Sequence, residues 1–149
     1  MTTRAKGQVL AFFAVLLPMI LLPVAAYAVD AAFVSTQAAS LQEATAQAAE
    51  AAAQQVDVAA LRASSSLVID TPASVVVANE ELRRSKPGAE VESVVVVGAQ
   101  VTVTAAEMVT LPFNFLPRSS IRLEARASAR VVGGYDSPSS RLPLPTSNF

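Results

Sequence analysis

The side chains able to do chemistry are few in this chain, and their spacing does not assemble a reaction centre. The 149 residues include no Cys and no His, so the thiolate nucleophile, the usual general base and the commonest metal ligands are missing. A Ser–Lys pair has only Lys6 or Lys86 to draw on, and Lys86 directly precedes Pro87. Glu80 and Glu81 are adjacent, so on a helix they point in different directions and do not converge on a substrate. We therefore predict a protein without enzymatic activity, cofactor or metal.

The composition indicates one small domain attached to an apolar segment. Hydrophobic residues make up 52% of the chain and the mean hydropathy is +0.45, but aromatic residues account for only 5%. A core would therefore be built from Ala, Val and Leu. The net charge is −1 and the chain has no basic patch of the kind that nucleic acid demands, so no nucleic-acid partner is predicted.

The N-terminal residues indicate a leader followed by a membrane span. Residues 1–7 form a short basic leader carrying Arg4 and Lys6, and residues 8–30 form an almost uncharged apolar segment. Its apolar run of about 21 residues is long enough to cross a hydrocarbon layer of roughly 30 Å at about 1.5 Å rise per residue. Lys and Arg before a first span favour leaving that end in the cytoplasm. We therefore expect a single-pass membrane protein whose C-terminal domain lies outside the cytoplasm.

The end of this segment permits more than one interpretation. Pro18 and Pro23 predict a kink within the span. Asp30 marks the membrane boundary, either as an interfacial residue or as a contact with a partner helix. A competing interpretation is a secretory signal cleaved near Ala28, because Ala26-Tyr27-Ala28 fits a small-x-small site, and cleavage would release a secreted or periplasmic binding domain. The apolar run exceeds the roughly 7 to 15 residues of a signal core, which favours the retained span.

Residues 31–63 are predicted to continue the span as an alanine-rich helix, because no Gly or Pro occurs until Pro72. A polar stripe recurs every three or four positions, at Ser40, Glu43, Gln47, Glu50, Gln54 and Asp57. The other faces are mostly Ala, and small side chains allow close approach of helices. We predict a helix-packing interface at Ala44, Ala48 and Ala52, formed with other helices and in part with the chain's own domain.

Residues 64–132 are predicted to form a second helix followed by a sheet. The helix starts at Asp70-Thr71-Pro72, with Asp70 or Thr71 as N-cap and Pro72 in the first turn, and it stops at Pro87-Gly88. Its apolar face is expected to contain Val75, Val76, Ala78, Asn79 and Leu82.

Alternating and β-branched runs predict a three-stranded antiparallel meander. Residues 91–97 and 101–104 flank a hairpin at Gly98-Ala99-Gln100, and residues 121–131 alternate with charges on one face. Packing of the second helix and part of the first on the apolar face of this sheet gives an α+β fold. Residues 133–149, rich in Ser and Pro, are expected to form an irregular tail.

The loop between the last two strands gathers large apolar side chains between prolines, at Leu111, Phe113, Phe115 and Leu116. The prolines disfavour a regular strand here. Large apolar side chains are usually buried, so one interpretation is that they cap the open end of the sheet. The other is an exposed patch that meets the membrane surface or a partner subunit.

These segments, taken in order, are similar to a known family. The resemblance rests on the basic leader with Gly7, the apolar run 8–18, Asp30, the alanine-rich residues 41–53 and the Val-Thr-Val-Thr strand followed by a Pro/Phe/Leu loop and an Ile-Arg-Leu-Glu-Ala-Arg-Ala strand. The pattern resembles the TadE/TadG-like proteins of bacterial tight-adherence (Flp-type) pilus assembly systems. It covers most of residues 4–132.

The resemblance implies a pseudopilin that a prepilin peptidase cuts between Gly7 and Gln8. TadE-like members commonly carry Glu at the fifth position after the cut, where this chain has Phe12. That departure makes the chain look closer to the TadG side, or to a minor pilin that stays in the membrane. The implied partners are other pilin-like subunits and pilus assembly proteins. The implied location is the bacterial inner membrane, with incorporation into a surface pilus as a further expectation.

Overall fold

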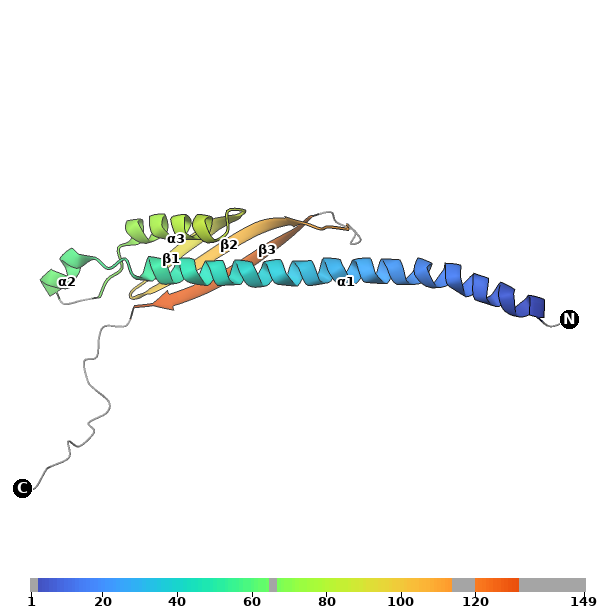
Figure 1. The fold of residues 1–149 in the computed structure, drawn as a ribbon. Helices are drawn as coiled ribbons and strands as arrows, with labels where there is room; N and C mark the ends of the chain where they lie inside the picture. Colours follow the sequence, from blue (N-terminus) through green and yellow to red (C-terminus); the bar gives the residue numbers. More distant parts are fainter. Residues whose placement is uncertain (1–2, 65–66, 114–119, 132–149) are drawn as a thin grey trace, which may run out of the picture.

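The structure, a computed structural model, describes residues 3–64, 67–113 and 120–131. Within these ranges the chain forms a long N-terminal helix, two shorter helices and a three-stranded antiparallel sheet, so the fold is α+β as predicted (Figure 1). The sheet is one layer, and two of the helices cover one of its faces. We call the part from Asp30 onward the head.

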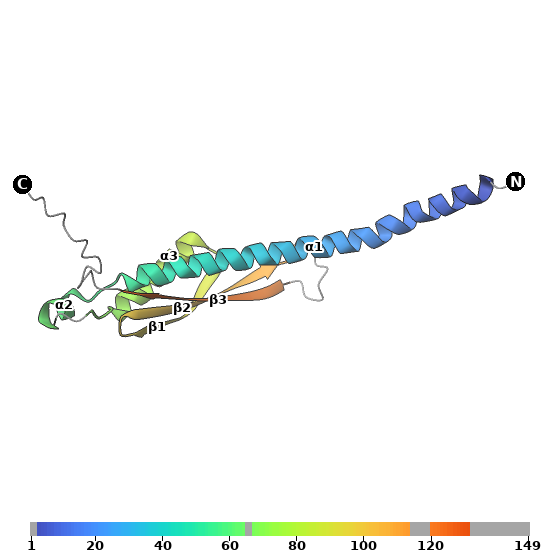
Figure 2. The ribbon, with the colours of Figure 1, turned by 90° about the horizontal axis from the view of Figure 1, so that it is seen from below.

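Helix α1 (Thr3–Ala53) is 51 residues long and belongs both to the apolar stretch and to the head. Residues 12–29 project beyond the head, whereas the C-terminal half of α1 lies along the sheet (Figures 1 and 2). Pro18 and Pro23 lie inside the helix, which curves toward its N-terminal end in Figure 2. A proline removes one backbone hydrogen bond and crowds the preceding turn, which accounts for the curvature.

The alanine-rich helix ends earlier than the sequence predicts. Helix α1 stops at Ala53, and α2 (Val58–Ser64) is a separate short helix, so residues 31–63 do not form one continuous helix. The backbone N–H of Asp57 donates to the Val68 carbonyl at 2.9 Å. Asp57 Oδ1 accepts from two backbone N–H groups of α2, at 2.8 and 3.0 Å. Asp57 is therefore the cap of a new helix and not the last member of the polar stripe of α1.

Helix α3 (Thr71–Ser85) begins and ends where the sequence predicts. Asp70 is its N-cap, with Oδ1 accepting from the Ala73 N–H at 3.1 Å, and a proline occupies the first turn. At the other end the Lys86 N–H donates to the Leu82 carbonyl at 2.7 Å, just before Pro87. These local signals need no help from tertiary packing, which is why the sequence alone reveals them.

The buried face of α3 differs from the predicted one. Its buried members recur every four residues, at Ser74, Ala78 and Leu82. Val75 and Val76, expected in the core, are exposed, and so is Asn79. Ser74 can occupy a buried position because its hydroxyl donates to the Ala52 carbonyl at 2.9 Å, which gives the buried hydroxyl a hydrogen-bond partner.

Strands β1 (Ala89–Val97), β2 (Gln100–Thr110) and β3 (Ser120–Arg130) form the predicted meander, in the order β1-β2-β3. The β1–β2 hairpin turns at Gly98, whose φ of 60° lies in the left-handed region that favours glycine. Strand β2 is longer than the predicted 101–104, because its antiparallel pairing with β3 continues without interruption to Thr110.

The core between the two layers is made of small side chains. On the sheet, the buried residues and those packed against them include Ala89, Val91, Val94, Val96, Val101, Val103, Ala105, Ala125, Ala127 and Ala129. On the helices the corresponding positions are mostly Ala, with Leu41 and Leu82 as the largest. Small groups on both surfaces let α1 lie close to the sheet. The core is therefore filled by this close approach and not by bulky aromatic side chains.

Candidate functional site: the junction between the apolar stretch and the head

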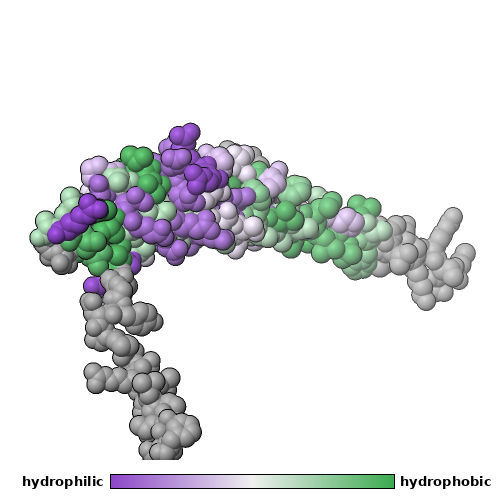
Figure 3. All heavy atoms as spheres, turned by 60° about the vertical axis from the view of Figure 1, so that its left-hand side comes forward, coloured by the Kyte–Doolittle hydropathy of each residue, from purple (hydrophilic) through white to green (hydrophobic). Residues whose placement is uncertain are grey.

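Residues 12–29 of α1, which precede the head, form a bare apolar surface. Its exposed large side chains are Phe12, Phe13, Val15, Leu17, Met19, Ile20, Leu21, Leu22, Val24, Tyr27 and Val29. The described residues contain one helix long and apolar enough that it could span a membrane, and its apolar window lies in this N-terminal part. Figure 3 shows the change from the hydrophobic arm to the polar surface of the head. A continuous apolar surface of this size marks a contact with lipid or protein.

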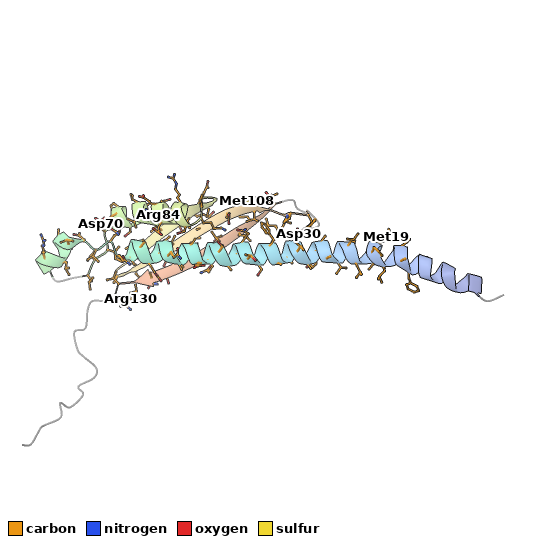
Figure 4. All side chains as sticks on the ribbon, viewed as in Figure 1. Met19, Asp30, Asp70, Arg84, Met108 and Arg130 are labelled. Atoms are coloured by element: carbon orange, nitrogen blue, oxygen red, sulfur yellow. The ribbon has the colours of Figure 1, made fainter. Side chains whose placement is uncertain are left out.

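Asp30 stands where this bare surface ends, and its carboxylate is fully buried, with 0% exposure. Asp30 Oδ1 accepts from the backbone N–H of Phe113 at 3.0 Å. Burial of a carboxylate is costly unless it is hydrogen-bonded, and a charge-assisted bond to a backbone N–H is among the stronger ones. Asp30 therefore fastens the segment that follows β2 to α1. Figure 4 labels Asp30 on α1.

The observed contact of Asp30 is with its own chain. The sequence suggested an interfacial residue or a contact with a partner helix. The structure shows the side chain enclosed by the head, at the point where the apolar stretch ends, and its place at a membrane boundary stays a prediction. The partner lies 83 positions along the chain, which explains why sequence reasoning missed it. Only the position of an isolated carboxylate at the end of an apolar run signalled that Asp30 was special.

The apolar loop after β2 divides into a buried and an exposed part. Leu111 is buried, with 4% of its surface exposed, so it caps the end of the core. Phe113, two residues further on, is 59% exposed although its backbone is held by Asp30. Phe115 and Leu116 lie outside the described residues. Leu111 thus fits the expected capping role, and Phe113 fits the expected exposed apolar surface.

The predicted helix-packing face of α1 is buried inside the chain. Ala44 and Ala48 pack in a cluster with Leu82 of α3 and with alanines of the sheet, and Ala52 belongs to a second cluster with Ala78. The expected packing of this face on the chain's own domain is therefore confirmed. Because these three alanines are buried inside the head, they are not available for contact with a second chain in this structure. The polar stripe predicted on the other side of α1 is exposed from Ser40 to Gln54, as an amphipathic helix on its own domain requires.

A buried polar node that the sequence did not reveal ties α1, α3 and β2 together. Lys86, only 8% exposed, lies beyond the end of α3. Its Nζ donates to Gln37 Oε1 at 2.7 Å and to Ser40 Oγ at 3.3 Å, and lies 3.1 Å from Glu107 Oε2 in an ion pair. Gly88 packs against the same carboxylate, since a Cβ there would lie 3.0 Å from Glu107 Oε1.

This node brings together a lysine and a serine, the one pairing that the sequence left open for a nucleophile. The amino group of Lys86 donates hydrogen bonds to Gln37 and Ser40 and forms an ion pair with Glu107. In this contact Nζ donates and Ser40 Oγ accepts, which is the reverse of the direction in which a base takes a proton from a serine. The arrangement is that of a structural clamp between elements, and the Gln37–Ser40 spacing on one face of α1 was its only local signal.

The remaining predicted positions lie at the ends of the chain. Gly7 and Gln8 fall in the first turns of α1, and cleavage between them stays a prediction. The tail at residues 133–149 lies outside the described residues.

In comparisons with known proteins, no family model, no curated protein and no solved structure matches this chain.

Proposed function

We propose that the chain is a membrane-anchored, pseudopilin-like component of a bacterial tight-adherence-type pilus assembly system. It acts through helix packing and protein–protein contact. The observation that carries the proposal is the continuity of α1, which runs unbroken from a bare apolar surface into the core of the head. Anchor and head are thereby one mechanical element, as a subunit that packs through its apolar helix requires.

The sequence resemblance supplies the biological context of this proposal. The leader with Arg4 and Lys6 favours an N-terminus in the cytoplasm and a head outside it, by the bias of basic residues toward the cytoplasm. The leader is removed between Gly7 and Gln8 by a prepilin peptidase. The partners are other pilin-like subunits and pilus assembly proteins in the inner membrane, and assembly into a surface pilus follows from the same resemblance.

Contacts through the bare face can be tested by cysteine crosslinking in the native host, because the chain has no Cys of its own. Single cysteines at Leu17 and Leu21, which are exposed, are expected to crosslink to a pilus assembly protein identified by mass spectrometry. Ala48→Cys is the matched control, since Ala48 is buried inside the head. Absence of such adducts at both exposed positions, with the assembly system expressed, would reject helix packing as the mode of action.

A second candidate function is a released binding domain, produced by cleavage near Ala28. The geometry is compatible with it, because Asp30 and its bond to Phe113 lie just beyond the cut and would stay with the head. The N-terminal sequence of the mature protein separates the possibilities. A start at Gln8 supports pilin-like processing, whereas a start at Val29 supports the released domain and removes the anchor from the mechanism.

A further inference from the structure

The aromatic side chains of the described residues occupy two levels along α1. The whole chain has six Phe, two Tyr and no Trp. Phe12 and Phe13 lie at one end of the bare stretch, where their rings meet edge to face. Tyr27, Phe33 and Phe113 lie around the other end, near Asp30, and no aromatic residue occurs in the sequence from 34 to 112. In its described residues the head therefore carries aromatic rings only at the end facing the apolar stretch.

The separation of these two levels matches a bilayer. From Phe12 to Asp30 the helix rises by roughly 27 Å at about 1.5 Å per residue, close to the hydrocarbon thickness of about 30 Å. Aromatic rings with one apolar and one hydrated end concentrate at the two membrane–water interfaces. Tyr27, exposed on α1 within one turn of Asp30, has this character.

The fold holds Phe113 at the level of Asp30 along α1, at the end of the apolar stretch nearer the head. The Asp30 carboxylate fixes its backbone N–H at 3.0 Å, and the neighbouring Leu111 is buried in the head. The ring of Phe113 nevertheless remains 59% exposed. The Asp30 side chain is itself fully buried, so no exposed carboxylate stands at the end of the apolar stretch. An exposed ring next to an enclosed carboxylate suits a lipid surface better than bulk water.

We propose that the head rests directly on the bilayer surface, with Phe113 inserted in the interfacial layer at the level of Tyr27 and the Asp30–Phe113 bond fixing that height. The occupant of this end of the head is thus lipid, continuous with the lipid around the apolar stretch. The inference rests on the membrane anchor in the proposed function and adds a second, loop-borne contact to it.

The absence of tryptophan makes a direct test possible with the full-length chain in lipid vesicles. Phe113→Trp introduces the sole Trp at the contact, and Val97→Trp places one at the hairpin at the far end of the head, where Val97 is 71% exposed. Leu21→Trp reports on the anchor. We expect Trp at 113 to emit at shorter wavelength than Trp at 97, and to be quenched by lipids brominated near the headgroup. Trp at 21, halfway between the two interfaces, is expected to be quenched by lipids brominated deep in their acyl chains.

The outcomes separate the docked head from the anchor. Quenching at positions 21 and 113 with none at 97 supports the proposal. Quenching at 21 alone, with emission at 113 as red as at 97, overturns docking and leaves the anchor intact. No quenching at 21 overturns both. In the Phe113→Trp background, Asp30→Asn keeps an acceptor oxygen and is expected to retain more quenching than Asp30→Ala; equal quenching in the two would reject the role given to the Asp30 bond.

Discussion

Ala48 provides the sharpest test of how the head is packed. Its side chain has 0% exposure and belongs to the cluster that joins α1 to Leu82 of α3 and to alanines of β2 and β3. Replacing it with Leu adds several carbon atoms at a point where the helix approaches the sheet mostly on small side chains. The larger side chain has no solvent path, so it must displace either the helix or a strand.

The size of the effect follows from close packing. If the site held an empty cavity, the added carbons would gain about 0.8 kcal/mol for each buried CH₂. A close-packed site instead costs about 1–3 kcal/mol in strain. For a domain of roughly 60–100 residues, 1 kcal/mol shifts the Tm by about 4–8 °C, so Ala48→Leu should lower the Tm by roughly 4–24 °C.

Thermal unfolding of the full-length chain in detergent micelles, followed by far-ultraviolet circular dichroism, measures this shift. The matched control is Gln47→Leu, which adds similar bulk on the adjacent, exposed face of α1 and should change stability by no more than about 0.5 kcal/mol. An unchanged Tm for Ala48→Leu, with loss of association between chains, would show that the alanine face contacts another subunit and would refute its packing against α3 and the sheet.

Three further changes test the remaining structural claims by the same measurement. Lys86→Met leaves Glu107 as an unpaired, largely buried carboxylate and should cost about 3–5 kcal/mol, with part recovered when Glu107→Leu is added; no recovery would contradict the ion pair. Asp70→Ala removes the N-cap of α3 and should cost about 0.5–2 kcal/mol, whereas Asp70→Asn should cost less. Gly98→Ala, at a φ of 60°, should cost about 1–2 kcal/mol and Gly98→Asn less, and equal costs would contradict the left-handed turn.

The elements that the sequence predicted correctly are those with local signals. Asp70 with a following proline specifies the start of α3, and the alternation of residues 101–104 specifies one buried face of β2. A two-residue turn at Gly98 then fixes the antiparallel pairing of β1 and β2. These signals operate within a few residues, so neither tertiary contacts nor homologous sequences are needed to interpret them.

The errors arose where a distant contact decides between local alternatives. Nothing near Asp57 distinguishes a residue on a continuing helix from the cap of a new one. The bond from its backbone N–H to the distant Val68 carbonyl favours the break between α1 and α2. The buried face of α3 likewise depends on Ser74 finding the Ala52 carbonyl. Hydrophobicity alone assigned Val75 and Val76 to the core, although the direction of approach of α1 leaves them exposed.

The candidate site was only half visible in the sequence for the same reason. The apolar stretch and the carboxylate at its end are neighbours along the chain, so composition marked them. Phe113 reaches Asp30 only because α1 and β2 lie side by side, with the end of β2 beside the end of the apolar stretch. The Lys86–Glu107 pair joins two elements by the same route, and no spacing rule relates such residues.

The position of the two prolines bears on how the junction works. Pro18 and Pro23 both lie in the bare stretch, and from residue 24 to Ala53 the helix has neither Pro nor Gly. The residues that favour bending of α1 therefore lie in the bare apolar stretch. The segment that passes Asp30 into the head is an uninterrupted helix. That segment is joined to the sheet and to α3 by the alanine face and by the Lys86 node. If Phe113 rests on the lipid surface as proposed, the head has a second support and would hold one orientation relative to the membrane.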